Sequence, residues 1–253
     1  MLTAKQSLRQ FLRLLFADRL VGDEVVEIVF HRAATFGNEI KPNDNVTAFR
    51  TLNEMWREAH ELDDYAPPFT NAALMQSLGE PPSKIQMSLL LHDVLGLGDK
   101  EIAEIIAPAS NSVTELIVSG RVMHASRADG VVIIIEDEPV IASDLRSIVE
   151  RLGGYVAGVA AKAEKAVSLI KKHKPDLVLA DYNLIGEKTG VDVVAESRDV
   201  HDCPVIFVTG FPETVLEGKD IEPDVVIGKP YSHEGIAAAV SHCLSVERPG
   251  VRQ

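Results

Sequence analysis

Cysteine, tryptophan and basic side chains are scarce in this chain of 253 residues. The two cysteines, Cys203 and Cys243, stand 40 positions apart, which matches no metal-ligand spacing, so we expect two unpaired thiols. Lys and Arg number 25 against 38 Asp and Glu, which gives a formal net charge of −13. This charge argues against non-specific nucleic-acid binding, because such binding depends on cationic side chains that neutralise phosphates.

Long apolar runs are also missing. No stretch approaches the ~20 consecutive apolar residues that a transmembrane helix needs. Charged residues, among them Arg9, Arg13 and Asp18, interrupt the first apolar run, and we therefore expect no signal peptide. With 46% hydrophobic residues and enough length for two domains, the chain can bury a proper core. These features predict a cytoplasmic protein that does not associate with a membrane.

The apolar pattern changes character near residue 128. Before that point apolar residues recur at helical spacing, and no convincing strand is found. The run from Asp63 to Pro68 contains two acidic residues and two prolines, which is typical of a linker. We expect a helical region over 1–62, a linker over 63–80, and a second helical region over 81–124 with helices near 83–95, 99–107 and 112–122.

From Val131 onward, short β-branched runs alternate with helical segments. Val131–Ile135 is apolar throughout, as expected of a strand that is buried on both faces. Strands are expected at 131–135, 155–160, 176–180, 204–208 and 224–228, and helices at 139–152, 162–173, 190–199, 212–219 and 232–246. This alternation predicts a doubly wound parallel α/β sheet of five strands over 130–247. Such sheets bind their ligands at the carboxyl ends of the strands.

Polar side chains follow four of these strands. Glu136, Asp137 and Glu138 come after the first, Asp181 after the third, Thr209 ends the fourth, and Lys229 follows the fifth. A single acidic residue in such a place is most often a turn or a helix cap. The occurrence of all these residues at one edge of one sheet instead indicates a functional site.

The chemistry of the set is coherent. Mg²⁺ prefers carboxylate oxygens, which Glu136, Asp137 and Asp181 can supply, and the ion offsets their mutual repulsion. Asp181 can attack a phosphoryl group as a carboxylate nucleophile. The Lys229 ammonium can neutralise charge on the transferred group, and the Thr209 hydroxyl can donate a hydrogen bond to it.

Residues 131–246 resemble response-regulator receiver domains. The matching motifs are Glu136-Asp137-Glu138, Pro175-Asp176 through Asp181, Val208-Thr209-Gly210 and Lys229-Pro230, and 44 positions separate Asp137 from Asp181, a usual value in that family. The resemblance implies that Asp181 accepts phosphate from a sensor histidine kinase. It also implies that Mg²⁺ is held by Glu136, Asp137, Asp181 and the backbone carbonyl of Asn183. The Gly210-Phe211-Pro212 run departs from many receivers and predicts a short fourth helix.

Residues 82–122 resemble region 4 of an extracytoplasmic-function sigma factor, and residues 1–62 resemble region 2 more weakly. In the region 4-like part, Asp99 is expected to cap one helix, and the run from Ser112 to Glu115 is a capping box for the next. That second helix lacks the basic residues with which such sigma factors read DNA, since its first cation is Arg121. Leu116, Ile117 and Val118 cannot all face one core, so part of this helix is expected to present apolar surface to a protein, or else to pack within the chain.

A sigma-like domain without DNA-reading residues, followed by a receiver, resembles the PhyR-type response regulators of the general stress response. The resemblance implies an anti-anti-sigma factor that works by partner switching. In this scheme the unphosphorylated receiver occupies the sigma-like domain. Phosphorylation frees that domain to bind a small anti-sigma factor of the NepR type, which releases the sigma factor.

Two other functions stay open from the residues alone. One is a phosphorylation-controlled DNA-binding transcriptional regulator, which the net charge of −3 over residues 80–121 opposes. The other is an enzyme, for which the sequence offers no nucleotide-binding loop, no Ser-His-Asp arrangement and no zinc-ligand spacing. The prediction is therefore a non-enzymatic regulator whose partners are a histidine kinase and an anti-sigma factor, without DNA.

Overall fold

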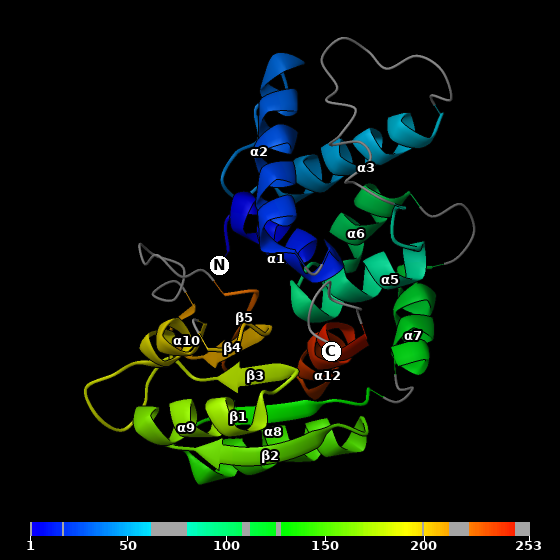
Figure 1. Ribbon diagram of the computed structural model, residues 1–253. Coiled ribbons are helices and arrows are strands. Elements are labelled where there is room, and N and C mark those ends of the chain that lie inside the picture. Colours follow the sequence, from blue (N-terminus) through cyan, green and yellow to red (C-terminus); the bar gives the residue numbers. More distant parts are fainter. Residues whose placement is uncertain are drawn as a thin grey trace. The chain divides into compact units, whose positions relative to one another are not determined.

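The computed structural model describes residues 2–16, 18–61, 80–107, 112–124, 128–198, 200–212 and 223–245. Its contacts divide the chain into two compact units, Met1–Gly120 and Arg121–Gln253, which we call the helical unit and the sheet unit (Figure 1). The expected linker at 63–80 and the expected helix at 212–219 lie almost wholly outside the described residues. The finer domain bounds stay predictions. Within the described ranges, no helix combines the length and the apolar character needed to cross a membrane.

Three long helices build the first half of the helical unit, each where the apolar periodicity predicts it. Phe11 of the first helix meets Phe49 of the third edge to face, with ring centroids 5.2 Å apart, and both side chains are fully buried. The second helix begins after Asp18, whose carboxylate accepts hydrogen bonds from two backbone N–H groups of the first turn. The bounds are α1 Ala4–Phe16, α2 Arg19–Thr35 and α3 Asn45–Glu61.

Shorter helices complete the unit: α5 Lys84–Leu89, the π-helical turn η1 Leu90–Val94, α6 Asp99–Ile106 and α7 Val113–His124. The predicted capping box of α7 is present, since Ser112 Oγ accepts from Glu115 N and Glu115 Oε2 accepts from Ser112 N, both at 3.2 Å. The expected cap of α6 was wrong. Gly98 occupies the cap, and its N–H donates to Glu101 Oε2 at 3.0 Å, so Asp99 becomes the first helical residue.

A five-stranded parallel sheet with the order β2-β1-β3-β4-β5 forms the sheet unit and confirms the predicted fold class. α9 and α10 cover one face, where the alternate β1 residues Ile133 and Ile135 join the core, while α8 and α12 pack together on the other (Figure 1). Each strand starts within one residue of its expected position. The bounds are β1 Val131–Ile135, α8 Pro139–Arg151, β2 Tyr155–Ala160, α9 Ala163–His173, β3 Leu177–Ala180, α10 Gly190–Arg198, β4 Val205–Thr209, β5 Val225–Gly228 and α12 His233–Ser245.

Two aspartates of this sheet accept hydrogen bonds from the first backbone N–H group of a neighbouring strand. Asp176, just before β3, accepts a hydrogen bond at 2.7 Å from the N–H of Val131, the first residue of β1. Asp224, just before β5, accepts one at 2.8 Å from the N–H of Val205, the first residue of β4. Each carboxylate satisfies an N–H at the beginning of a neighbouring strand, which would otherwise lose its partner on burial. These two contacts hold neighbouring strands at the end of the sheet opposite the predicted site.

Candidate functional site

The strand register brings the predicted site residues to one edge of the sheet. Ile135, the last residue of β1, is level with Ala180, the last of β3, so the residues that follow them emerge side by side. At the other side, Thr209 ends β4 level with Gly228 of β5, and the N–H of Lys229 donates to the Thr209 carbonyl at 2.8 Å. The parallel pairing therefore places the residues that follow β1 and β3, and those at the ends of β4 and β5, at the same edge of the sheet.

Three carboxylates meet at this edge. Oxygens of Glu136, Asp137 and Asp181 lie within 4.8 Å of one another. Glu136 is 2% exposed and Asp181 6% exposed, so both carboxylates are largely removed from water. The Tyr182 N–H donates to Asp181 Oδ1 at 2.6 Å, and the Glu138 N–H donates to Glu136 Oε1 at 3.1 Å. The cluster is thus held by local backbone hydrogen bonds.

Lys229 supplies the countercharge. Its ammonium lies 2.8 Å from Asp181 Oδ2 and 2.8 Å from Glu136 Oε2, and Glu138 Oε1 is further away at 3.8 Å. Burial would lower the pKa of the Lys229 ammonium, but its hydrogen bonds to Asp181 and Glu136 outweigh burial and raise that pKa. Burial raises the pKa of the Glu136 carboxyl although Lys229 opposes the shift. One cation thus bridges two buried acids.

The donor set fits a hard divalent cation. Mg²⁺ is bound through one or two carboxylates together with waters and phosphate oxygens, and three carboxylates at one point of the sheet edge supply such ligands. Asn183, whose backbone carbonyl completed the expected ligand set, lies two residues beyond Asp181 in the loop before α10, and it is exposed. Its role as a ligand stays a prediction.

Thr209 is completely buried at the end of β4. Its hydroxyl oxygen accepts a hydrogen bond from the N–H of Phe211 at 3.2 Å, so the hydroxyl proton remains available for another acceptor. The side chain of Phe211 itself is 56% exposed. The structure therefore places Thr209 at the predicted edge, while its contact with a phosphoryl group stays a prediction.

The loop that carries Asp181 is closed by a backbone contact that sequence reasoning missed. The N–H of Gly190 donates to the Tyr182 carbonyl at 2.8 Å, and a Cβ atom at Gly190 would lie only 2.0 Å from the backbone oxygen of Asp181. Thr189 and Asp192 cap the start of α10 through mutual hydrogen bonds of 2.7 to 3.3 Å. The glycine at the first position of the helix predicted over 190–199 was the available signal.

A second contact that the sequence did not reveal lies beside the site. The Tyr231 hydroxyl donates to Asp144 Oδ2 at 3.0 Å, and His233 Nε2 lies 3.0 Å from Asp144 Oδ1. Burial, followed by the hydrogen bond to Asp144, raises the pKa of the Tyr231 phenol. Tyr231 and His233 lie two and four positions after Lys229, whereas Asp144 lies on α8. No spacing rule connects positions this far apart.

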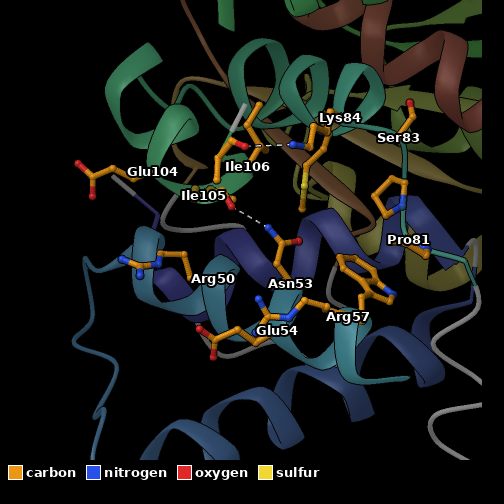
Figure 2. A pocket seen from close by; sticks show the side chains of 14 residues that line it. Arg50, Asn53, Glu54, Arg57, Pro81, Ser83, Lys84, Glu104, Ile105 and Ile106 are labelled. Carbon is orange, nitrogen blue, oxygen red and sulfur yellow. Dashed lines mark hydrogen bonds between the residues drawn. The ribbon is translucent and has the colours of Figure 1, made fainter. Parts of the chain in front are cut away.

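The helical unit contains a cavity of about 900 Å³ between α3 on one side and α5 and α6 on the other (Figure 2). Asn53 Nδ2 donates to the Ile105 carbonyl at 2.9 Å, and Lys84 Nζ donates to the Ala107 carbonyl at 3.0 Å. Both contacts satisfy carbonyls at the end of α6, which no residue within the helix can pair. Buried apolar side chains line the cavity, namely Trp56, Met87, Ile105 and Ile106.

Exposed charges surround this cavity. Arg50, Glu54 and Arg57 project from α3, and Glu104 projects from α6 (Figure 2). Among the residues that the structure describes, neither Arg50 nor Arg57 forms an ion pair. Two guanidinium groups thus border a cavity with an apolar floor.

The apolar residues of α7 are divided between a buried side and an exposed side, as the sequence predicts. Leu116 and Ile117 are 6% and 4% exposed, whereas Val118 is 52% exposed. Val122 and Met123, one turn further along, are 71% and 61% exposed. Val118, Val122 and Met123 thus add exposed apolar surface to this helix, beside the exposed charged residues Glu115 and Arg121.

Comparison with known proteins finds similarity to both parts of the chain. A family model of the response regulator receiver domain matches residues 132–241. The phyllosphere-induced regulator PhyR of Methylorubrum extorquens is 29% identical over 250 residues, which cover 97% of this chain and 93% of that protein.

Two solved structures resemble the chain over most of its length. A structure of the PhyR stress response regulator is 30% identical, with a TM-score of 0.70, and covers 94% of this chain and 92% of that one. The anti-anti-sigma factor PhyR from Bartonella quintana is 28% identical, with a TM-score of 0.69, and covers 94% of this chain and 91% of that one. The likeness therefore extends over the helical and the sheet units alike.

Proposed function

Because this chain belongs to the PhyR-type family of response regulators, we propose that it is a phosphorylation-activated anti-anti-sigma factor. Phosphorylation of the sheet unit makes the helical unit available to an anti-sigma factor, and the sigma factor bound by that protein is released for stress transcription. The observation that carries the proposal is the Lys229 ammonium, 2.8 Å from both Asp181 and Glu136 within a cluster of three carboxylates.

Asp181 is the phosphoacceptor in this proposal. A carboxylate oxygen of Asp181 attacks phosphorus of a phosphohistidine, the P–N bond breaks, and the imidazole leaves as its nitrogen takes up a proton. Lys229 neutralises charge that develops on the phosphoryl oxygens. Glu136, Asp137, Asp181 and the Asn183 carbonyl would hold Mg²⁺, which would supply positive charge that offsets the negative charge of the transferred group.

Thr209 reports the presence of the phosphate. Its hydroxyl keeps a free proton while its oxygen accepts from Phe211, so it can donate to a phosphoryl oxygen on Asp181. A phosphoryl group adds between −1.5 and −2 charges at pH 7, if it ionises as other phosphorylated side chains do. Thr209 and Lys229 at the sheet edge interact with that added charge, so the response to phosphorylation begins there.

The cavity between α3, α5 and α6 is the proposed docking site for the anti-sigma factor. Its apolar floor fits the apolar face of an amphipathic helix, and Arg50 and Arg57, which pair with no carboxylate among the described residues, offer two cations to carboxylates of that helix. The exposed side chain of Val118 on α7 supports a protein partner on the same unit. The net charge of −3 over residues 80–121 opposes binding to phosphates.

The proposal is tested with the full chain and a purified NepR-type anti-sigma factor in titration calorimetry. Acetyl phosphate with Mg²⁺ should tighten binding by at least tenfold, and the Asp181→Asn variant, which lacks the nucleophile, should not respond. Acid-labile phosphate on the Asp181→Asn protein at the wild-type level would refute the assignment of the acceptor. Equal affinity with and without phosphate on the wild-type chain would refute phosphorylation control.

The docking site has its own test in the same assay. Joint replacement of Arg50 and Arg57 by Glu should weaken binding of the phosphorylated chain, and most strongly at low salt, because two attractive contacts become repulsive. The Lys41→Glu variant is the control, with half the change in charge, since Lys41 is also exposed on the helical unit but lies outside the cavity. Equal effects of the two changes would place the partner elsewhere.

The alternative is a phosphorylation-controlled DNA-binding regulator. Its signature would be salt-sensitive binding of the full chain to a DNA duplex, because binding that rests on phosphate contacts weakens steeply with salt. The exposed face of α7, where Arg121 stands between Val118 and Val122, together with the net charge of −3 over residues 80–121, predicts no such binding at physiological salt. A gel shift at micromolar protein would favour the alternative.

A further inference from the structure

The loop that follows Lys229 is tied to a helix far away in the sequence. Tyr231 Oη donates to Asp144 Oδ2 at 3.0 Å, and His233 Nε2 lies 3.0 Å from Asp144 Oδ1, so one carboxylate contacts both side chains. These partners lie 87 and 89 positions from Asp144. We call Asp144, Tyr231 and His233 the α8 clamp.

The clamp fixes the loop at its far end, while the sheet fixes its near end. The N–H of Lys229 donates to the Thr209 carbonyl at 2.8 Å, which extends the β4–β5 pairing by one residue. Two residues later Tyr231 is held by α8, and His233 begins α12. The backbone of Lys229 is therefore anchored on both sides within a span of five residues.

The same contact also joins the two loops that supply the site. Glu136 and Asp137 lie between β1 and the start of α8 at Pro139, and Asp144 belongs to the second turn of that helix. Lys229 lies between β5 and α12. The clamp thus connects the helix that follows the carboxylates to the loop that carries the ammonium.

The contact is partly open to water, because the side chain of Asp144 is 33% exposed and that of His233 is 53% exposed. Tyr231 is half-buried. Its hydrogen bond to a carboxylate is stronger than a bond between two neutral groups, so Tyr231 is the donor on which the clamp is tested.

We propose that Asp144 is a positioning residue for phosphoryl transfer to Asp181, acting through Tyr231 and Lys229. A lysine side chain is flexible, and the placement of its ammonium depends on where its backbone is held. When the clamp is removed, the loop gains freedom and Lys229 spends less time in contact with Asp181 and Glu136. This inference rests on the proposed role of Asp181 as phosphoacceptor.

The experiment measures the phosphorylation rate of the full chain with phosphoramidate or acetyl phosphate over a range of Mg²⁺ concentrations. The Asp144→Ala and Tyr231→Phe variants should lower the rate at saturating Mg²⁺ by about tenfold, part of the ~100-fold that a misplacement of 1 Å can cost. The Mg²⁺ concentration for half-maximal rate should change by less than about twofold, because a change in positioning acts on the reacting step.

Three further variants separate positioning from a general loss of structure. Asp144→Asn keeps an oxygen that accepts from Tyr231, so its rate should lie nearer to wild type than that of Asp144→Ala. Glu150→Ala removes another α8 carboxylate, one that pairs with Arg146 at 3.3 Å, and should leave the rate unchanged. In a Lys229→Ala background, Asp144→Ala should lower the residual rate no further, since both changes act through one contact.

Several outcomes would overturn the inference. An unchanged rate in both Asp144→Ala and Tyr231→Phe would do so, as would an undiminished effect of Asp144→Ala in the Lys229→Ala background. A parallel loss of rate and of Mg²⁺ response in Asp144→Ala, without rescue in Asp144→Asn, would assign Asp144 a merely structural role. Failure of the proposed function looks different, because the wild-type chain itself would then take up no acid-labile phosphate.

Discussion

Replacement of Lys229 by Met should destabilise the metal-free sheet unit and make its stability strongly dependent on pH. The variant keeps much of the length and the apolar stem of the side chain but removes the ammonium, which lies 2.8 Å from both Asp181 and Glu136. Two buried carboxylates then face each other and Asp137 without their cation. Water cannot readily replace the lost ammonium, because both carboxylates are buried.

The magnitude follows from burial. Removing one partner of a buried ion pair typically destabilises a protein by 3–5 kcal/mol, because the other charge stays buried and uncompensated. The side chain of Lys229 is 16% exposed, while those of Glu136 and Asp181 are 1% and 7% exposed. Since some water reaches the ammonium, we expect the lower end of this range, about 3 kcal/mol at pH 8 without Mg²⁺.

The pH dependence has a definite sign. Burial raises the pKa of Glu136, so the folded state binds a proton more tightly than the unfolded state does. That contribution to stability is fully present below the ordinary pKa of a glutamic acid and is lost as pH rises through the raised value. Because Lys229 opposes this rise, its removal raises the pKa of Glu136 further. The destabilisation should therefore be smaller at pH 5 than at pH 8.

The measurement is urea unfolding in EDTA, followed by circular dichroism and by fluorescence. Trp56 is the only tryptophan of the chain and lies on α3, so its fluorescence follows the helical unit and serves as an internal reference. The control is Lys188→Met, which removes an ammonium at the same distance of 2.8 Å from Glu196, with both side chains nearly half exposed. Surface pairs of this kind add little to stability, and no measurable change is expected.

A result would contradict the argument if Lys229→Met shifted the circular dichroism transition no more than Lys188→Met does at pH 8. Addition of Mg²⁺ should restore part of the lost stability in Lys229→Met, because a ligand that binds only the folded state stabilises it by mass action. A variant that is equally destabilised at pH 5 and pH 8 would show that the carboxylates are not the source of the effect.

Two further changes test the supports of the sheet, one beside the site and one at the opposite end. Gly190→Ala would place a Cβ atom 2.0 Å from the backbone oxygen of Asp181, so it should destabilise the sheet unit by about 3 kcal/mol or more; Gly210→Ala, which meets nothing within 4 Å, should be nearly neutral in the same urea experiment. Asp224→Ala should cost about 2 kcal/mol, since the carboxylate is buried and the N–H of Val205 would lose its acceptor; a midpoint within error of wild type would show that another group replaces it.

The elements of the fold were accessible from the sequence because their signals are local. A β-branched run such as Val131–Ile135 or an apolar stripe on a helix is read within a short window, and each strand indeed starts within one residue of its expected position. The one cap that was wrong, Asp99, shows the limit of such reading. Gly98 and Glu101 satisfy the same helix start from neighbouring positions, and the sequence does not rank the two solutions.

The meeting of the carboxylates with Lys229 was also predictable, although the residues are far apart in the chain. Parallel strands carry their carboxyl ends to the same edge of the sheet, so a rule of topology replaces knowledge of the contacts. The register that makes Ile135 level with Ala180 then places Asp137 near Asp181. Sequence alone thus determined the fold class and which residues gather at the site.

Only the tertiary structure decided the contacts for which no such rule exists. The pairing of Asp144 with Tyr231 across 87 positions depends on how α8 packs beside the loop after β5. The cavity between α3 and α6 likewise depends on the distance at which two helices settle, and that distance is set by all their side chains together. Periodicity and strand ends are written in short stretches of chain, whereas the mutual placement of packed elements arises from many weak contacts that no short stretch contains.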